Sequence, residues 1–93
     1  MQKLSDQEIQ QALSTFPAWV LKNGELTKER TFKDFVAAMA FVNDVAQLAE
    51  TAGHHPDIDI RYNRVRLALV THDAGGITSK DIALAQKINS LEP

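Results

Sequence analysis

Two turn signals, each placed between runs of strand-forming residues, constrain the fold of this chain more than any other feature. Asn23-Gly24 is typical of a two-residue hairpin turn, in which both residues need a positive φ angle, and Asn63-Arg64 stands in an equivalent place. The flanking runs are 19–22 and 25–32 at the first turn, and 58–62 and 65–71 at the second. The sequence therefore predicts two antiparallel hairpins, enough for a four-stranded sheet.

Three helices are predicted around these hairpins. Ser5 and Glu8 form a capping box that starts the first helix, and Thr78 and Asp81 form a second box that starts the last one. Residues 32–50 contain no Gly or Pro and many alanines, which is typical of a long helix. We therefore expect an α+β fold of order α-β-β-α-β-β-α, a four-stranded antiparallel sheet with helices packed on one face.

The length of 93 residues predicts a single domain, spanning 1–93, with a small core. Its long helix has more apolar surface than one sheet needs, because its apolar residues form two stripes that point in different directions. One stripe is Phe35, Met39, Val42, Ala46 and Ala49, and the second is Phe41, Val45 and Leu48. We expect the second stripe to pack on another subunit of a homo-oligomer; a helix buried on both sides within its own domain is the alternative.

The composition removes several classes of function. The chain has no cysteine, which excludes disulfide scaffolds, cysteine zinc sites and thiol nucleophiles. Its net charge of −2 gives no general attraction to phosphate backbones, so we expect no direct nucleic-acid binding. No apolar run reaches the roughly 20 residues of a membrane-spanning helix, and the N-terminus lacks the apolar core of a signal peptide. We therefore expect a cytoplasmic protein without a membrane partner.

All three histidines lie at the outer ends of the second predicted hairpin. His54 and His55 precede its first strand, and His72 follows its second strand. Because neighbouring strands lie about 5 Å apart, the hairpin should bring the three imidazoles within roughly 10 Å of one another. An imidazole can accept and donate a proton near neutral pH, so the cluster predicts acid and base catalysis on one small molecule.

Two other interpretations of these histidines stay open. Any one of them can be structural, as a loop or capping residue. A zinc site is the second alternative, since three histidines can hold zinc, although the adjacent His54 and His55 tend to point apart in extended backbone.

Three further residues are candidates for supporting roles. Glu50 ends the predicted long helix just before His54, where it can orient an imidazole or remain solvated. Asp81 is required by the capping box, so its predicted role is mainly structural. Trp19 is expected to be a core or rim aromatic, with stacking on a flat ligand as the alternative.

The string Glu50-x-x-x-His54-His55-Pro56, followed by Tyr62-Asn63, His72 and Asp81, resembles the signature of the pterin-4a-carbinolamine dehydratases. The resemblance covers nearly the whole chain. It also includes Trp19, Phe32-Lys33-Asp34-Phe35 and Ser79-Lys80-Asp81-Ile82. One departure is Lys80, where animal members commonly carry Arg, which has a bidentate geometry that lysine lacks.

The resemblance implies a hydro-lyase. In that family a 4a-hydroxytetrahydropterin, the product of pterin-dependent hydroxylases, loses water to give quinonoid dihydropterin, and a reductase then regenerates tetrahydropterin. The match assigns the active site to His54, His55 and His72. It makes His54 and His72 the acid and base, in an order left open, and lets His55 hold the ring and the hydroxyl. It implies no metal and no organic cofactor.

The resemblance also implies a substrate site and an assembly. Pterin binding is assigned to two segments, with the residues His54, His55, Pro56, Thr71, His72, Asp73 and Ala74. Family members are dimers or tetramers, and the tetramer joins two dimers through long helices. An animal relative is also a dimerisation cofactor for a transcription factor, so the second hypothesis is a non-catalytic, oligomerising partner-binding protein.

Overall fold

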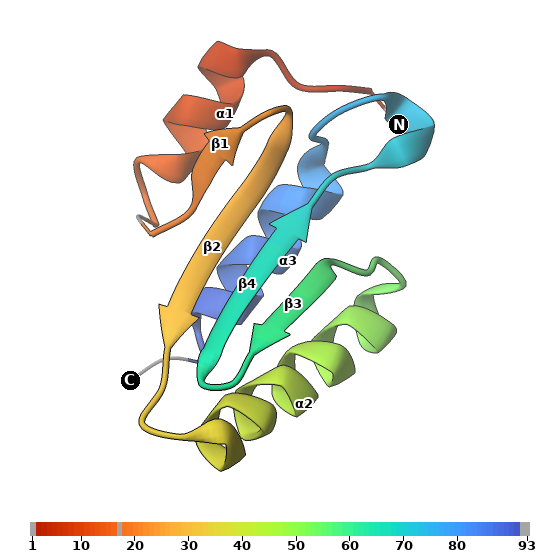
Figure 1. Cartoon of the computed structure of the whole chain (residues 1–93). Coiled ribbons are helices and arrows are strands. Elements are labelled where there is room, and N and C mark those ends of the chain that lie inside the picture. Colours follow the sequence, from red (N-terminus) through yellow and green to blue (C-terminus); the bar gives the residue numbers. More distant parts are fainter. Residues whose placement is uncertain (1, 17, 92–93) are drawn as a thin grey trace.

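The structure, a computed structural model, describes residues 2–16 and 18–91. Its elements follow one another in the predicted order (Figure 1). They are α1 (Asp6–Leu13), β1 (Val20–Lys22), β2 (Glu25–Thr31), α2 (Phe35–Ala52), β3 (Asp57–Arg61), β4 (Arg64–Leu69), a 3₁₀ turn (His72–Ala74) and α3 (Ser79–Asn89).

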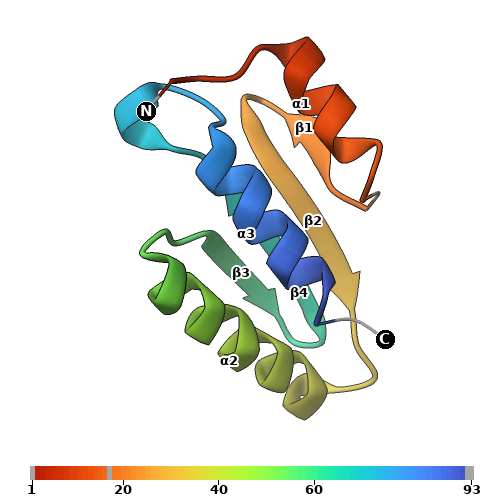
Figure 2. The same cartoon turned by 180° about the vertical axis from the view of Figure 1, so that it is seen from behind.

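The four strands form one antiparallel sheet in the order β1-β2-β4-β3. The three helices lie over the same face of this sheet (Figure 2). The predicted α+β fold is therefore confirmed. None of the helices in the described ranges is both long enough and apolar enough to cross a membrane.

The first hairpin has the predicted turn, and the second hairpin corrects the prediction by one residue. Leu21 pairs with Leu26 across Asn23-Gly24, and both turn residues have positive φ. In the second hairpin Arg61 pairs with Arg64, so the turn is Tyr62-Asn63.

Asn63 explains this shift, because it is bound to the end of β2. Its side-chain amide donates to the Phe32 carbonyl at 2.8 Å, and its own carbonyl accepts from the Phe32 amide at 2.8 Å. Tyr62 therefore leaves the strand and is 66% exposed rather than part of the core.

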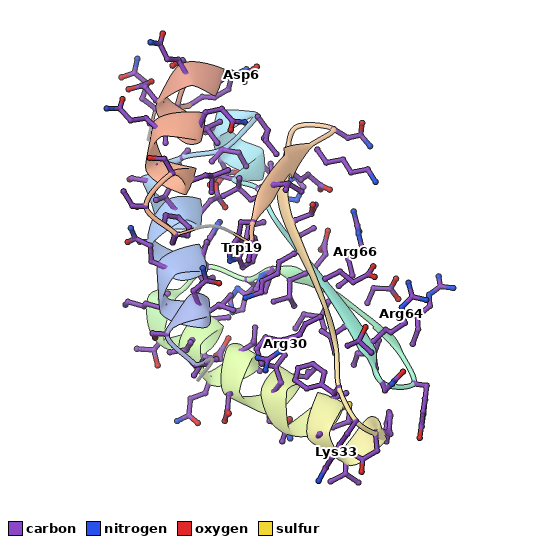
Figure 3. The ribbon with its side chains drawn as sticks, turned by 90° about the vertical axis from the view of Figure 1, so that its left-hand side faces the viewer. Asp6, Trp19, Arg30, Lys33, Arg64 and Arg66 are labelled. Atoms are coloured by element: carbon purple, nitrogen blue, oxygen red, sulfur yellow. The ribbon has the colours of Figure 1, made fainter. Side chains whose placement is uncertain are left out.

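The two faces of the sheet differ in chemistry. Figure 3 shows Trp19 and Arg30 lying between the sheet and the helices, whereas Arg64 and Arg66 extend away from the helices on the uncovered face. The register explains the alternation, because Arg30 pairs with Val65 on the helix side, and Glu29 pairs with Arg66 on the open side. The core is thus a single layer between the sheet and the helices.

The long helix corrects the predicted subunit contact. Phe41 and Val45 are 7% and 0% exposed within this one chain, and Leu48 packs on the same core. Phe41 contacts Phe32 at the end of β2, with ring centroids 5.1 Å apart. Phe41 and Val45 of the second stripe are therefore buried in the chain's own core and leave no surface for another subunit, while Leu48 is half-buried; Val42 and Ala49 of the first stripe are buried too, so the alternative of burial within the chain's own domain describes α2 better. The expected contact through Phe41 and Val45 was wrong because α2 runs alongside β3 with these side chains turned towards the other elements (Figure 1).

Candidate active site

Two loops meet where β3 begins and β4 ends. His54 and His55 lie in the loop between α2 and β3, and His72 lies in the 3₁₀ turn after β4. Asp57 pairs with Ala68, so the hairpin brings these loops together. All three imidazoles line one open hollow of about 310 Å³, as the hairpin argument predicted. Its lining residues are Gly53, His54, His55, Val70, Thr71, His72, Asp73 and Lys80.

A smaller hollow of about 140 Å³ adjoins the first and shares three of its lining residues. It is lined by Thr71, Asp73, Ala74 and Lys80. Of the residues assigned to the pterin, all except Pro56 line one hollow or the other. Pro56 is half-buried, and it lines neither hollow.

The C-terminus of α2 fixes the direction of the first loop. Gly53 ends the helix in the left-handed conformation, with φ +66°, which costs a glycine little because it has no Cβ. The His54 amide then donates back to the Ala49 carbonyl at 3.2 Å. The chain therefore leaves the helix sharply, and both histidines follow directly after the turn.

His54 is held by a buried carboxylate. Its Nε2 lies 2.5 Å from Asp81 Oδ1, and the two side chains are 13% and 0% exposed. The other Asp81 oxygen, Oδ2, accepts from the Thr78 amide at 2.9 Å and from the Thr71 hydroxyl at 2.7 Å. Asp81 therefore completes the predicted capping box of α3 and also orients an imidazole, a contact that the sequence interpretation, which gave Asp81 a mainly structural role, had not predicted.

His55 has a similar contact in different surroundings. Its Nε2 lies 2.5 Å from Glu50 Oε2, but the two side chains are 60% and 78% exposed. Glu50 therefore orients an imidazole while remaining solvated, so both alternatives considered for it describe part of its position. Water screens such a pair strongly.

His72 is presented by a tight turn. The Thr71 amide donates to the Gly76 carbonyl at 3.0 Å, and Gly75 closes the turn with φ +74°. The His72 side chain is exposed, and its ring has no hydrogen-bond partner within the described ranges. Both of its nitrogens are therefore open to a ligand in the hollow.

Trp19 lies elsewhere, which corrects its assignment as a supporting site residue. It is 3% exposed, and its Nε1 donates to Asn89 Oδ1 at 2.9 Å. Asn89 is the last residue of α3, whereas Asp81 lies in its first turn. Trp19 is thus a core residue at the opposite end of α3 from the histidines, where the buried Lys28 donates to the same Asn89 oxygen at 2.8 Å.

Sequence reasoning had not assigned Gly53, Val70 and Lys80 to the site, although they line the hollow. Lys80 had a signal, since it directly precedes the motif residue Asp81 and replaces the arginine common in animal members of the resembling family. Across residues 2–16 and 18–91, no three His, Cys, Asp or Glu side chains are arranged to hold a metal ion. What the hollow offers a ligand is three imidazoles, one carboxylate and one ammonium group.

Comparisons with known proteins identify relatives of this chain. The family described as Pterin 4 alpha carbinolamine dehydratase matches residues 2–91. A protein of Acidobacterium capsulatum, named "Putative pterin-4-alpha-carbinolamine dehydratase", is 62% identical over 91 residues, covering 98% of this chain and 99% of its own length. A protein of the same name from Chloroflexus aurantiacus is 58% identical over 91 residues, covering 98% of both chains.

Two solved structures share the fold. A crystal structure from Brucella melitensis, described as transcriptional coactivator/pterin dehydratase, has a TM-score of 0.92 and 34% identity, covering 98% of this chain and 99% of that one. A pterin dehydratase-like protein described as a RuBisCO assembly factor has a TM-score of 0.68 and 24% identity, covering 82% and 90% of the two chains. The second likeness concerns the fold alone.

Proposed function

Because the chain belongs to the Pterin 4 alpha carbinolamine dehydratase family, we propose that it dehydrates a 4a-hydroxytetrahydropterin to quinonoid dihydropterin and water. One observation carries the proposal: three imidazoles line one hollow, and a buried carboxylate holds one of them. The reaction would serve tetrahydropterin recycling.

The reaction needs two proton movements. The hydroxyl on the 4a carbon takes up a proton, the C–O bond breaks and water leaves. The neighbouring ring nitrogen loses its proton, and its electron pair forms the new C=N bond. The atoms and charges balance without an oxidant or a reductant, so a base and an acid on the same ligand are sufficient.

His54 is the base in this proposal. At neutral pH a carboxylate only accepts hydrogen bonds, so His54 Nε2 donates to Asp81 and Nδ1 keeps its lone pair for a substrate proton. The Asp81 charge stabilises the imidazolium that forms, as the carboxylate of a catalytic triad does.

His72 is the acid in this proposal, and His55 holds the substrate. His72 is exposed and lines the hollow, where a protonated ring can reach the leaving hydroxyl. His55 and Asp73 line the same hollow and offer polar groups to the pterin ring.

A stopped-flow assay with freshly generated 4a-hydroxytetrahydropterin tests the proposal. We expect His54→Ala and His72→Ala each to lower the dehydration rate about 10²-fold or more, because each removes a proton-transfer group. The exposed Asn43→Ala on α2 is the matched control, and its rate should equal that of the wild type. Wild-type protein that does not accelerate dehydration contradicts the proposal.

We propose further that the chain forms a homo-oligomer through a different surface from the one predicted. Large apolar side chains are exposed at the start of α2 and around the edge strand β3. They are Phe35, Val36, Ile60 and Tyr62, at 47%, 76%, 36% and 66% exposure. An edge strand also leaves backbone groups free to pair. These features support association of copies along this edge.

Sedimentation velocity measures this assembly directly. Ile60→Lys should reduce the mass to that of the 10.3 kDa chain, because it places a charge on the proposed contact surface. Val20→Lys is the matched control, since Val20 is 57% exposed on the opposite edge strand. Equal masses for the two variants would contradict the proposed surface.

A non-catalytic, oligomerising partner-binding protein is the second candidate function, and the same exposed apolar surface favours it. The B. melitensis neighbour carries both names in its description. The assay above separates the two functions, because only the enzyme requires His54 and His72.

A further inference from the structure

Two threonine hydroxyls meet behind the His54–Asp81 pair, and the proposed mechanism does not use them. Thr71 directly precedes the 3₁₀ turn, and Thr78 is the N-cap of α3. Their hydroxyl oxygens lie 2.8 Å apart, and the Thr71 oxygen lies 2.7 Å from Asp81 Oδ2. Thr78 and Asp81 are fully buried, and Thr71 is half-buried.

The number of protons on each group determines which group donates and which accepts in this series of hydrogen bonds. A carboxylate oxygen only accepts, and a hydroxyl has only one proton to donate. The Thr71 proton therefore goes to Asp81 Oδ2, and the Thr78 hydroxyl donates to the Thr71 oxygen. The Thr78 oxygen in turn accepts from the Lys80 amide at 3.3 Å. Donors thus reach Asp81 from one side through the threonines and from the other side through His54 Nε2.

Helix capping alone does not require Thr71. The capping box of α1 has the same reciprocal bonds, from the Ser5 amide to Glu8 at 2.8 Å and from the Glu8 amide to the Ser5 hydroxyl at 3.1 Å. Within the described ranges, neither Ser5 nor Glu8 bonds a side chain from outside its own helix end. The box of α3 differs because a hydroxyl from the β4 side and an imidazole from the α2 side bind the same carboxylate.

We propose that Thr71, with Thr78 behind it, is a positioning residue for His54 that acts through Asp81. The threonine bonds hold Oδ2, so that Oδ1 stays directed at His54 Nε2 and the imidazole keeps its proton on that atom. The ring of His54, which lines the hollow, thereby keeps the lone pair of its base nitrogen Nδ1. Thr71 was assigned to substrate binding, but its only hydroxyl proton is used inside the protein. The inference rests on the proposed function for its effect on the rate.

The first test is an NMR measurement that needs no substrate. In the ¹⁵N-labelled full chain, His54 Nε2–H should give a downfield resonance that exchanges slowly with water, because a buried carboxylate accepts it. Thr71→Val removes the hydroxyl at nearly constant shape and should broaden or abolish this resonance, and Thr71→Ser should restore it. Thr27→Val is the matched control, since Thr27 is a buried threonine on β2 whose hydroxyl donates to the Val20 carbonyl, at 3.5 Å; it should keep the resonance.

The second test is kinetic. Thr71→Val should lower kcat about tenfold and leave KM within about twofold of the wild type, because it removes an orienting bond and keeps the shape of the side chain that lines the hollow. Thr71→Ser should recover most of kcat. A Thr71→Val protein that keeps both the resonance and kcat overturns the proposal, and so does a Thr71→Ser protein that recovers neither.

Two further outcomes are also decisive. If Thr71→Val fails to fold, Thr71→Ala takes its place, and a wild-type spectrum without the protected His54 resonance overturns the proposal without any variant. If the wild type catalyses no dehydration, the proposed function fails, and the spectra alone decide whether Thr71 positions His54.

Discussion

Two histidine–carboxylate pairs border the same hollow, with the same separation of 2.5 Å, and they differ in almost everything else. The His54–Asp81 pair combines 13% and 0% exposure, whereas the His55–Glu50 pair combines 60% and 78%. Asp81 is bonded through both of its oxygens, and Glu50 extends from the end of a helix into water.

The comparison teaches that the distance between two groups does not by itself give the strength of their interaction. A charged pair in water is screened by solvent and contributes about 0–1 kcal/mol, while removing one partner of a buried pair leaves an uncompensated polar group. We therefore expect the first pair to set the orientation and proton position of its imidazole. The second pair should bias His55 only weakly.

The largest effect is expected from Asp81→Asn. Asp81 accepts hydrogen bonds from His54 Nε2 and from the Thr78 amide with its two different oxygens. An asparagine has only one acceptor oxygen, so its NH₂ group must face one of these two donors. The dehydration rate should fall about 10²-fold or more, and the free energy of unfolding should fall by about 2 kcal/mol. Stopped-flow kinetics and urea denaturation measure the two losses. A dehydration rate within threefold of the wild type would contradict the expectation that the buried pair matters more than the exposed pair.

Gly53→Ala disturbs the backbone that leads to both histidines. An added Cβ would meet no atom within 4 Å, so the cost comes only from φ +66°. We expect the free energy of unfolding to fall by about 1 kcal/mol, with a smaller loss of rate than in Asp81→Asn. Chemical denaturation checks this value; a loss of several kcal/mol would mean that the loop is held by more than its backbone conformation.

Glu50→Gln is expected to change little. The carboxylate is exposed, so its removal should slow dehydration by less than about threefold and change the free energy of unfolding by less than about 0.5 kcal/mol. The same assays as for Asp81→Asn give a direct comparison. A loss of dehydration rate equal to that of Asp81→Asn would contradict the expectation that a buried pair contributes more to the rate than an exposed pair.

The smallest expected effect is that of salt, which should act on the exposed pair and not on the buried pair. At 1 M NaCl the Debye length is about 3 Å, so the small difference between Glu50→Gln and the wild type should disappear. The loss caused by Asp81→Asn should persist, because the buried pair is out of reach of mobile ions. The measurement is the dehydration rate of the three proteins in low and high salt.

Local patterns predicted much of this molecule. The turn at Asn23-Gly24 and the capping boxes of α1 and α3 have the expected form, because each depends on neighbours in the chain. The meeting of the three histidines in one hollow also followed from the hairpin, since strand pairing places its outer ends together. These features required no knowledge of how the helices pack.

Other features depended on contacts between distant segments. Asn63 moved the second turn because it binds the end of β2, and the rotation of α2 about its axis buried Phe41 and Val45 in the core. Two amphipathic stripes on one helix look equivalent in sequence, so only packing decides which residues of each are covered; Val42 and Ala49 of the first stripe are buried as well. The exposed apolar residues consequently lie at Phe35, Val36, Ile60 and Tyr62.

The sequence by itself thus determined the fold class, the family signature and the gathering of three histidines, because these follow from short-range patterns and from one hairpin. Only the tertiary structure decided that Asp81 binds His54 and that Thr71 binds Asp81. These bonds join the end of α2, the end of β4 and the start of α3. They arise from three elements far apart in the sequence, whose side chains meet only when the helices have packed on the sheet.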